Sequence, residues 1–541
     1  MKRILASSLA LLICLPAFAL ANGQALTPPM GWNSWYKFLG NYNETIIRQT
    51  ADSMVTNGLV AAGYRYLNLD DCWTQGARDG NGNLLAGTNF PSGMAANAAY
   101  IHGDGMKAGI YSGVPSGGYC GAYTLVGHEI QDVNEFVSWG YDFLKCDSAN
   151  SESNEIWLVQ TAISRANQNM LLSLSDGHFE TWMPGLGNMW RISGDTSDSW
   201  SATMTVLDNM NQSWRYAGPG HWNDADMLQV YVNGGMSDTE YRSHFSMWCI
   251  TAAPLLLAMD VRSISAAALQ IVTNAELIAV DQDAAGVQGH KVAVSAGTGG
   301  NLEVWMKPLG TDGTTKAVAL LNRSSVAANI TAYWTNIDLN PNFSATIRDL
   351  WLHGSLGSGT GSFTTNVASH GCVVLQIVGA PIPPSASVAD FLATMPQGTY
   401  RQYKNISAVT SSGNSIQYPL TLGGTNYPKG FGIVAPSRID IDLTKMAGQP
   451  ETFLSDCKID DAMGSSGSVD FQVWCDGIKQ WESGTVTGSS GVTNANVNVA
   501  GVSLLSLIVT NLSGVPSQND CADWGDPRIL RWRKPSLRAH Q

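Results

Sequence analysis

Short apolar runs alternate with helix-like stretches from about residue 25 to residue 285. The runs expected to form strands are residues 64–69, 108–111, 143–146, 170–174, 189–192 and 253–257. Helix-like segments such as residues 44–57 and 153–167 lie between them. Alternation of this length is typical of a parallel α/β fold, and eight such units would close into a (β/α)8 TIM barrel.

Acidic residues gather just after the expected strands. They are Asp70, Asp71, Asp147, Asp176, Asp195, Asp224 and Asp226. In an α/β barrel the carboxyl ends of the strands meet at one rim, and catalytic residues come from that rim. We therefore expect these side chains to surround a common site.

Two of these carboxylates have a cationic residue close by in the sequence. Lys145 stands two residues before Asp147, and Arg191 stands four residues before Asp195. Residues i and i+2 of a strand share a face, so Lys145 should lie beside Asp147 and favour its ionised form. Hydrolysis of a glycosidic bond needs two carboxyl groups at one cavity, one for the anomeric carbon and one to protonate the leaving oxygen. The sequence thus predicts a glycosidase that uses no cofactor and no metal ion.

Beyond residue 290 the pattern changes to alternating and β-branched runs with glycine-rich turns, which favours an antiparallel β-sandwich. A proline-rich stretch follows, of the kind that forms stiff linkers, and then more strand-like runs. We expect six parts: a signal peptide, the barrel, a β-sandwich, a linker, a second all-β module and a basic tail. Their expected bounds are 1–21, 22–288, 289–379, 380–388, 389–532 and 533–541.

The amino terminus has the features of an export signal. Lys2 and Arg3 precede an apolar stretch over residues 4–20, and a small-residue cleavage site ends at Ala21. No later segment has the ~20 uninterrupted apolar residues of a membrane span. We expect a secreted or periplasmic protein with no membrane partner.

The amino-acid composition indicates which class of molecule the protein binds. The net charge is −13 and only 13% of residues are charged, whereas nucleic-acid binding requires clustered Lys and Arg. The 18 tryptophans suit stacking on sugar rings. The expected partner is a carbohydrate substrate, bound by a monomer or a homodimer, and not a nucleic acid.

Dispersed segments in the first 290 residues match one family in the same order. They are PPMGWNSW (28–35), YLNLDDCW (66–73), GIY (109–111), FLKCD (143–147), GPGHWNDADML (218–228), APL (253–255) and VDQD (280–283). With these motifs the chain resembles glycoside hydrolase family 27, the retaining α-galactosidase family. The resemblance implies a (β/α)8 barrel followed by an antiparallel β domain, and a substrate with a terminal α-D-galactosyl residue.

The resemblance also implies roles for single residues. Asp147 would be the nucleophile and Asp195 the general acid/base. Retention of configuration predicts carboxyl groups about 5–5.5 Å apart, against about 6.5–9.5 Å for inversion. The residues implied in substrate binding are Trp35, Asp70, Asp71, Tyr111, Lys145, Arg191, Asp226 and Met227.

The chain departs from the family pattern after the fifth expected strand. Many members have Cys-Glu-Trp there, whereas this chain has LSDGHFE at 174–180, in which Asp176 can still accept a hydrogen bond from a sugar hydroxyl. β-L-Arabinopyranosidase and isomalto-dextranase specificities therefore remain alternatives, as does a sugar-binding protein without activity. The short pair Asp70 and Asp71 leaves room for a hydroxymethyl group, which favours galactose.

Cysteines also differ from the family. Members usually have a cysteine two residues after the nucleophile, where this chain has Ala149, and the partner expected for Cys72 is replaced by Gly40. A Cys72–Cys120 bridge, a Cys120–Cys146 bridge and reduced cysteines all remain open.

The last part of the chain resembles a second family. The matching runs are KGFGI (429–433), SVDFQVWCDG (468–477) and DCADW (520–524). They are similar to the NPCBM type of carbohydrate-binding module. This resemblance implies a C-terminal β-sandwich that binds galactose-like ends or packs on the barrel.

Overall fold

The structure is a computed structural model. It describes residues 22–114, 120, 124–147, 153–167, 169–381, 385–387, 403–404, 408–409, 415–416, 420–427, 430–443, 449–512 and 520–532. The expected signal peptide and the basic tail lie outside these ranges. The chain divides into two compact units, Met1–Pro381 and Ile382–Gln541.

Eight parallel strands form the sheet of the first unit, in the order β10-β1-β2-β5-β6-β7-β8-β9. The sheet closes where Leu228, just past β9, pairs with Leu257 of β10. The strands are β1 (Met30–Asn33), β2 (Tyr66–Asn68), β5 (Lys107–Gly113), β6 (Phe143–Asp147), β7 (Leu171–Ser175), β8 (Met189–Arg191), β9 (Trp222–Asp224) and β10 (Leu255–Leu257). The predicted TIM barrel is confirmed.

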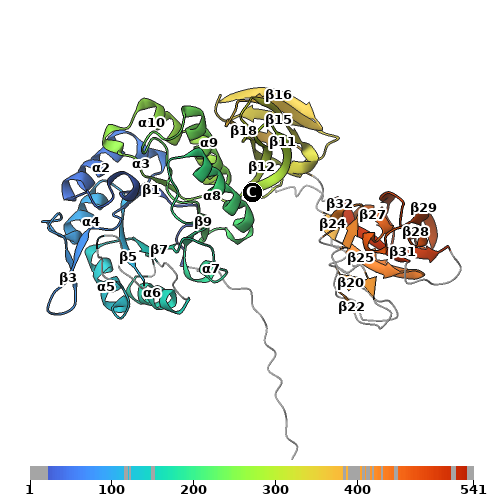
Figure 1. The fold of residues 1–541 in the computed structure, drawn as a ribbon, viewed down its shortest axis with the longest axis horizontal. Helices are drawn as coiled ribbons and strands as arrows, with labels where there is room; N and C mark the ends of the chain where they lie inside the picture. The colour runs from blue at the N-terminus through green and yellow to red at the C-terminus, as the bar shows by residue number, and fades with distance from the viewer. Residues whose placement is uncertain are drawn as a thin grey trace, which may run out of the picture. The chain divides into compact units, whose positions relative to one another are not determined.

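Helices surround the barrel strands (Figure 1). They are α1 (Trp35–Phe38), α2 (Glu44–Thr56), α3 (Leu59–Ala62), α4 (Met94–Gly103), α5 (Glu129–Trp139), α6 (Ser153–Ala166), α7 (Met183–Leu186), α8 (Trp200–Ser213), α9 (Asp238–Ile250), α10 (Ala266–Val272) and α11 (Ala275–Asp281). No helix among the described residues is long and apolar enough to cross a membrane.

Local sequence explains where the long helices begin and which face they bury. The Asn43 side chain accepts a hydrogen bond from the Ile46 amide and so caps α2, as Ser199 does for α8. Along α2, Ile47, Ala51 and Met54 fall on one buried face at helical spacing. Each large apolar side chain buried in this way contributes about 1.5–3 kcal/mol.

An antiparallel β-sandwich follows the barrel in the same unit. Its main sheet has the order β11-β12-β13-β18-β15-β16, and β14 pairs with β17 beside it. The strands are β11 (His290–Gly297), β12 (Gly300–Leu309), β13 (Thr315–Asn322), β14 (Ala328–Tyr333), β15 (Ser344–Asp349), β16 (Gly354–Thr360), β17 (Ser362–Val367) and β18 (Cys372–Val378). Ion pairs join it to the barrel, including Arg323 with Asp208 of α8 and Arg348 with Glu276 of α11.

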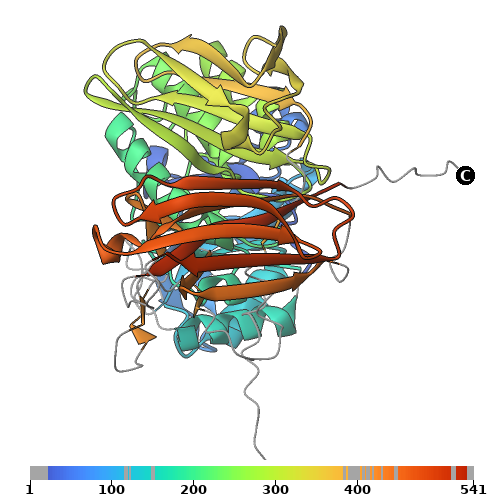
Figure 2. The ribbon, with the colours of Figure 1, turned by 90° about the vertical axis from the view of Figure 1, so that its right-hand side faces the viewer.

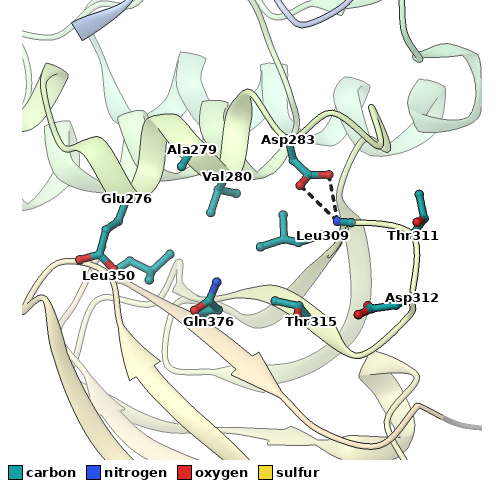
Figure 3. Close-up of a pocket in the computed structure, with 11 residues that line it drawn as sticks. Glu276, Ala279, Val280, Asp283, Leu309, Thr311, Asp312, Thr315, Leu350 and Gln376 are labelled. Atoms are coloured by element: carbon teal, nitrogen blue, oxygen red, sulfur yellow. Dashed lines mark hydrogen bonds between the residues drawn. The ribbon is translucent and has the colours of Figure 1, made fainter. Parts of the chain in front are cut away.

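A cavity of about 480 Å³ lies between α11 and the strands of the sandwich (Figure 3). Its carboxylates are engaged by the protein. Glu276 pairs with Arg348 and His353, and the Gly310 N–H is shared between the two carboxylate oxygens of Asp283. The cavity therefore belongs to the joint between the two parts of this unit.

The second unit is also antiparallel β, as expected for the C-terminal module. One sheet has the order β20-β25-β32-β27-β30 and the other β26-β31-β28-β29, and long strands lie side by side in Figure 2. The bounds are β20 (Tyr403–Lys404), β25 (Gly430–Val434), β26 (Ser437–Asp442), β27 (Gln449–Ile459), β28 (Ser468–Cys475), β29 (Ile478–Thr487), β30 (Thr493–Asn498), β31 (Leu504–Asn511) and β32 (Cys521–Trp532). Within the stretch expected as a linker, β19 (Ser385–Ser387) pairs with β32.

One disulfide joins Cys72, just past β2, to Cys120. Of the three alternatives left open by the sequence, this one is present, and Cys146 is a free buried cysteine. A Cβ atom built on Gly40 would lie 2.9 Å from the Cys72 sulfur and 3.1 Å from the Cys120 sulfur. Gly40 thus leaves the space that the Cys72–Cys120 disulfide occupies.

Removal of this disulfide should destabilise the barrel. The bond closes a loop across 48 residues, which corresponds to about 2–4 kcal/mol. We expect a Cys72→Ala/Cys120→Ala variant to unfold at lower urea concentration than the parent protein. Reductant should lower the parent's midpoint and leave that of the variant unchanged. An equal effect of reductant on both proteins would contradict the assignment.

Candidate active site

A compact cavity lies at the carboxyl ends of the barrel strands. The residues that line it are Trp35, Tyr36, Asp70, Asp71, Tyr111, Lys145, Asp147, Arg191, Asp195, Asp226 and Met227. The structure therefore brings together ten of the eleven site residues named from the sequence. Asp176 is the exception, and Tyr36 is an addition.

Asp147 is held by the neighbouring strand. The Tyr111 hydroxyl donates a hydrogen bond of 2.7 Å to Asp147 Oδ2. This contact follows from the parallel register of β5 and β6, which pairs Gly113 with Asp147 and Tyr111 with Lys145. The second carboxylate oxygen, Oδ1, takes no part in this bond.

Lys145 makes its direct ion pair with Asp70 and not with Asp147. Its Nζ donates to Asp70 Oδ2 over 2.8 Å, and the Asn33 amide group donates to the same oxygen. Burial disfavours the charged amine, yet the Asp70 and Asp147 carboxylates outweigh this effect and raise the pKa of Lys145 above its ordinary value. The ammonium thus interacts electrostatically with both carboxylates.

Asp71 is oriented by the two bonded cysteines. The Cys72 amide donates to Asp71 Oδ1 over 2.6 Å, and the Cys120 amide donates to Asp71 Oδ2 over 3.1 Å. Cys72 has a φ of 80°, which is in the left-handed region and uncommon for a residue with a side chain. The disulfide and the orientation of Asp71 therefore belong to one local structure.

Arg191, at the end of β8, lies between two carboxylates. Its Nη2 is 2.9 Å from Asp226 Oδ2 and 3.3 Å from Asp195 Oδ1. Burial disfavours the charged guanidinium, while Asp226 and Asp224 raise the pKa of Arg191. The fixed cation therefore sits beside the carboxylate expected to act as acid/base.

Tyr36 is a site residue that the sequence analysis does not predict. Its hydroxyl donates to Asp226 Oδ2 over 2.5 Å, and burial together with Asp226 raises the pKa of Tyr36 well above its ordinary value. It follows Trp35 in the four-residue helix α1, which is too short for any periodic pattern to reveal an inward face. Only its position beside Trp35 could have suggested it.

Asp195 lies on the loop after β8 and its side chain is 71% exposed. The sequence predicts Asp195 at a strand end, whereas β8 ends four residues earlier at Arg191. The protein itself therefore does not cover Asp195. A substrate bound in the cavity would have to shield it from water.

Asp176 is not among the residues that line the cavity. The register of β6 and β7 pairs Asp147 with Ser175, the last residue of β7, and Asp176 follows just outside the strand. Asp176 is buried and acts electrostatically on the neighbouring Cys146. The expected contact between Asp176 and a substrate stays a prediction.

Asp71, Cys72 and Cys120 bring three ligand-type atoms within 4.8 Å of one another, as a metal site would require. The two sulfurs form the disulfide, so neither offers a thiolate to a metal ion. Within the part of the chain that the structure describes, no other such group of three His, Cys, Asp or Glu residues is found.

Three protein families match this chain. Residues 27–283 match the family described as alpha galactosidase A, and residues 299–377 match the alpha galactosidase C-terminal beta sandwich domain. Residues 392–530 match the NPCBM/NEW2 domain. The matches follow the same order as the barrel, the sandwich and the C-terminal module.

Individual proteins match over the first two parts. An α-galactosidase from Oryza sativa subsp. japonica is 46% identical over 365 residues, which cover 65% of this chain and 85% of that protein. An α-galactosidase from Coffea arabica is 48% identical over 362 residues, which cover 65% of this chain and 93% of that protein. The crystal structure of α-galactosidase I from Mortierella vinacea superposes with a TM-score of 0.63 at 31% identity, covering 67% of this chain and 99% of that one.

Asp224, at the end of β9, gives the site a pH-dependent stability. Burial raises the pKa of Asp224 to about 6 from an ordinary 3.8, although Arg191 acts to lower it. Between these two values the folded protein keeps a proton that the unfolded chain has released. The free energy of unfolding therefore falls as the pH rises from about 4 to about 6.

We expect Asp224→Asn to remove this contribution. The difference in unfolding free energy between variant and parent should change by up to about 3 kcal/mol between pH 4 and pH 7. Urea midpoints measured across this range test the expectation. Parallel curves for the two proteins would show that folding leaves the pKa of Asp224 unchanged.

Proposed function

This chain belongs to glycoside hydrolase family 27, the α-galactosidase family, and from that premise we propose that it is a secreted retaining exo-glycosidase that hydrolyses terminal α-D-galactosyl residues. The observation that supports the reaction is the shared cavity of Asp147 and Asp195. One carboxylate is fixed by Tyr111 beside the ammonium of Lys145, and the other is exposed beside the guanidinium of Arg191.

In the first step Asp147 attacks the anomeric carbon. Because Tyr111 occupies Oδ2, the attacking oxygen is Oδ1. The bond from the anomeric carbon to the leaving oxygen breaks as Asp195 donates its proton to that oxygen. The products of this step are a covalent galactosyl ester of Asp147, the released alcohol and an Asp195 carboxylate.

In the second step a water molecule replaces the enzyme at the anomeric carbon. Asp195 takes a proton from this water, the new carbon–oxygen bond forms, and the ester bond to Asp147 breaks. Asp195 is then protonated again and Asp147 ionised. Two inversions give overall retention of the α configuration.

The cavity also supports recognition of a single terminal sugar. Asp70 and Asp71 accept hydrogen bonds, and Lys145 donates them, at the side of the cavity formed by β2 and β6. Both carboxylates are short, which leaves room for the hydroxymethyl group that distinguishes galactose from L-arabinopyranose. Trp35 offers a ring face on which a sugar can stack.

Export and carbohydrate binding by the C-terminal module complete the proposal. The basic start, the apolar stretch and the small residues before position 22 support export. The NPCBM/NEW2 match supports a carbohydrate-binding role for residues 392–530. A disulfide at Cys72 is consistent with an oxidising compartment.

Loss of the Asp147 carboxylate should abolish turnover. We expect the wild-type protein to hydrolyse 4-nitrophenyl α-galactoside, and Asp147→Asn to lower kcat by about 10⁴-fold or more, because an amide cannot form the glycosyl ester. Asp142→Asn is the matched control, since Asp142 lies just before the same strand and pairs with His102 outside the cavity. Hydrolysis of dextran in place of the galactoside would overturn the proposed substrate.

The role of Asp195 can be tested through the leaving group. Asp195→Ala should lower kcat/KM, which reports the first step alone, about 10²–10⁴-fold for a sugar leaving group, which needs protonation, and far less for 2,4-dinitrophenolate, which does not. Proton NMR of the first product formed by the wild type should show α-galactose. A β product, or equal losses for both leaving groups, would contradict the assigned mechanism.

A further inference from the structure

A second, larger cavity adjoins the active site and shares Asp195 with it. We name it the α8 groove and define it by Phe179, Asp195, Thr205, Asn209, Gln212 and Tyr216, which are among its lining residues. Its volume is about 810 Å³, within the range of ligand-binding pockets. Because Asp195 lines both cavities, the groove begins where the active-site cavity ends.

The length of α7 explains why the groove exists. The segment between β7 and β8 contains only the four-residue helix α7, whereas the neighbouring helices α6 and α8 have 14 residues each. A short helix covers little of the flank of α8. Thr205, Asn209 and Gln212 lie at helical spacing along that flank, so they share one face of α8.

The polar groups of the groove suit an uncharged sugar chain. Side-chain amides both donate and accept hydrogen bonds, as sugar hydroxyls require. Among the described residues, the side chains of Asn209, Gln212 and Tyr216 have no hydrogen-bond partner in the protein. Their donors and acceptors face solvent in the groove and are available to a ligand.

Aromatic rings provide the apolar part of the surface. The Phe179 and Tyr216 rings lie 4.6 Å apart, and Tyr216 is 40% exposed. Such rings pack against the apolar faces of pyranose rings. Phe179 also belongs to the segment 174–180, in which the sequence differs from the Cys-Glu-Trp of the resembled family.

We propose that the α8 groove binds the leaving group of the substrate, and that this group is an uncharged oligosaccharide extending from Asp195 along α8. The inference rests on the proposed function, since Asp195 protonates the oxygen that joins the galactosyl residue to the leaving group. The active-site cavity takes the terminal sugar, so the rest of the chain continues past Asp195. From Ala202 to Gln212 the helix rises about 15 Å, which is room for more than one sugar ring.

The test compares substrates that differ only beyond the bond that is cut. We would measure kcat/KM for 4-nitrophenyl α-galactoside, for melibiose, and for two longer substrates, stachyose and an α-galactosylated mannopentaose. The wild type should prefer at least one longer substrate over melibiose about tenfold. Asn209→Ala/Gln212→Ala should reduce that substrate's kcat/KM about tenfold more than it reduces the value for the aryl galactoside, as expected for two neutral hydrogen bonds.

A second variant and a control distinguish a selective loss of leaving-group binding from a general loss of structure. Tyr216→Ala should show the same selective loss, whereas Gln160→Ala on α6, outside both cavities, should show none. Equal losses on long and short substrates, or no preference of the wild type for either long substrate, would overturn the groove as a leaving-group site. Failure of the wild type to hydrolyse any of the galactosides would instead overturn the proposed function.

Discussion

The parallel register of the barrel strands is the constraint on which the site depends. It pairs Tyr111 with Lys145 and Arg191 with Asp224, so that side chains from different strands meet at one rim. A slip of one residue between two strands would turn every such side chain to the opposite face. The hydrogen bond from Tyr111 to Asp147 is a consequence of this register.

The second requirement of the site is that the charged side chains at the carboxyl ends of the barrel strands balance one another. A buried ion without a partner is costly, and two buried cations, Lys145 and Arg191, each lie among several carboxylates. Their partners raise the pKa of both cations against the effect of burial, which keeps them charged. The cavity thus holds fixed positive charge beside Asp147 and beside Asp195, where the proposed reaction moves electrons and a proton.

The sequence predicts the barrel because strand–helix alternation over 260 residues has few other solutions, and the strand ends then locate the carboxylates. Its failures have physical causes. The strands β1 and β9 lie in PPMGWN (28–33) and GPGHWND (218–224), where proline, glycine and polar residues interrupt any apolar run. Asp195 looks like a strand-end residue because Ile192 extends the apolar run beyond the last paired residue, Arg191. Asp176 stays a prediction, because it follows the last residue of β7, where the strand register no longer fixes the direction of a side chain.

The disulfide makes the position of one cavity carboxylate depend on the oxidation of two cysteines. The two amides that orient Asp71 belong to the two bonded cysteines, one of which has a left-handed backbone. In a reducing cytoplasm these amides lack their covalent tether, and the carboxylate they hold is correspondingly less fixed. Formation of the Cys72–Cys120 bond would therefore be the last covalent step that fixes the Asp71 side of the cavity.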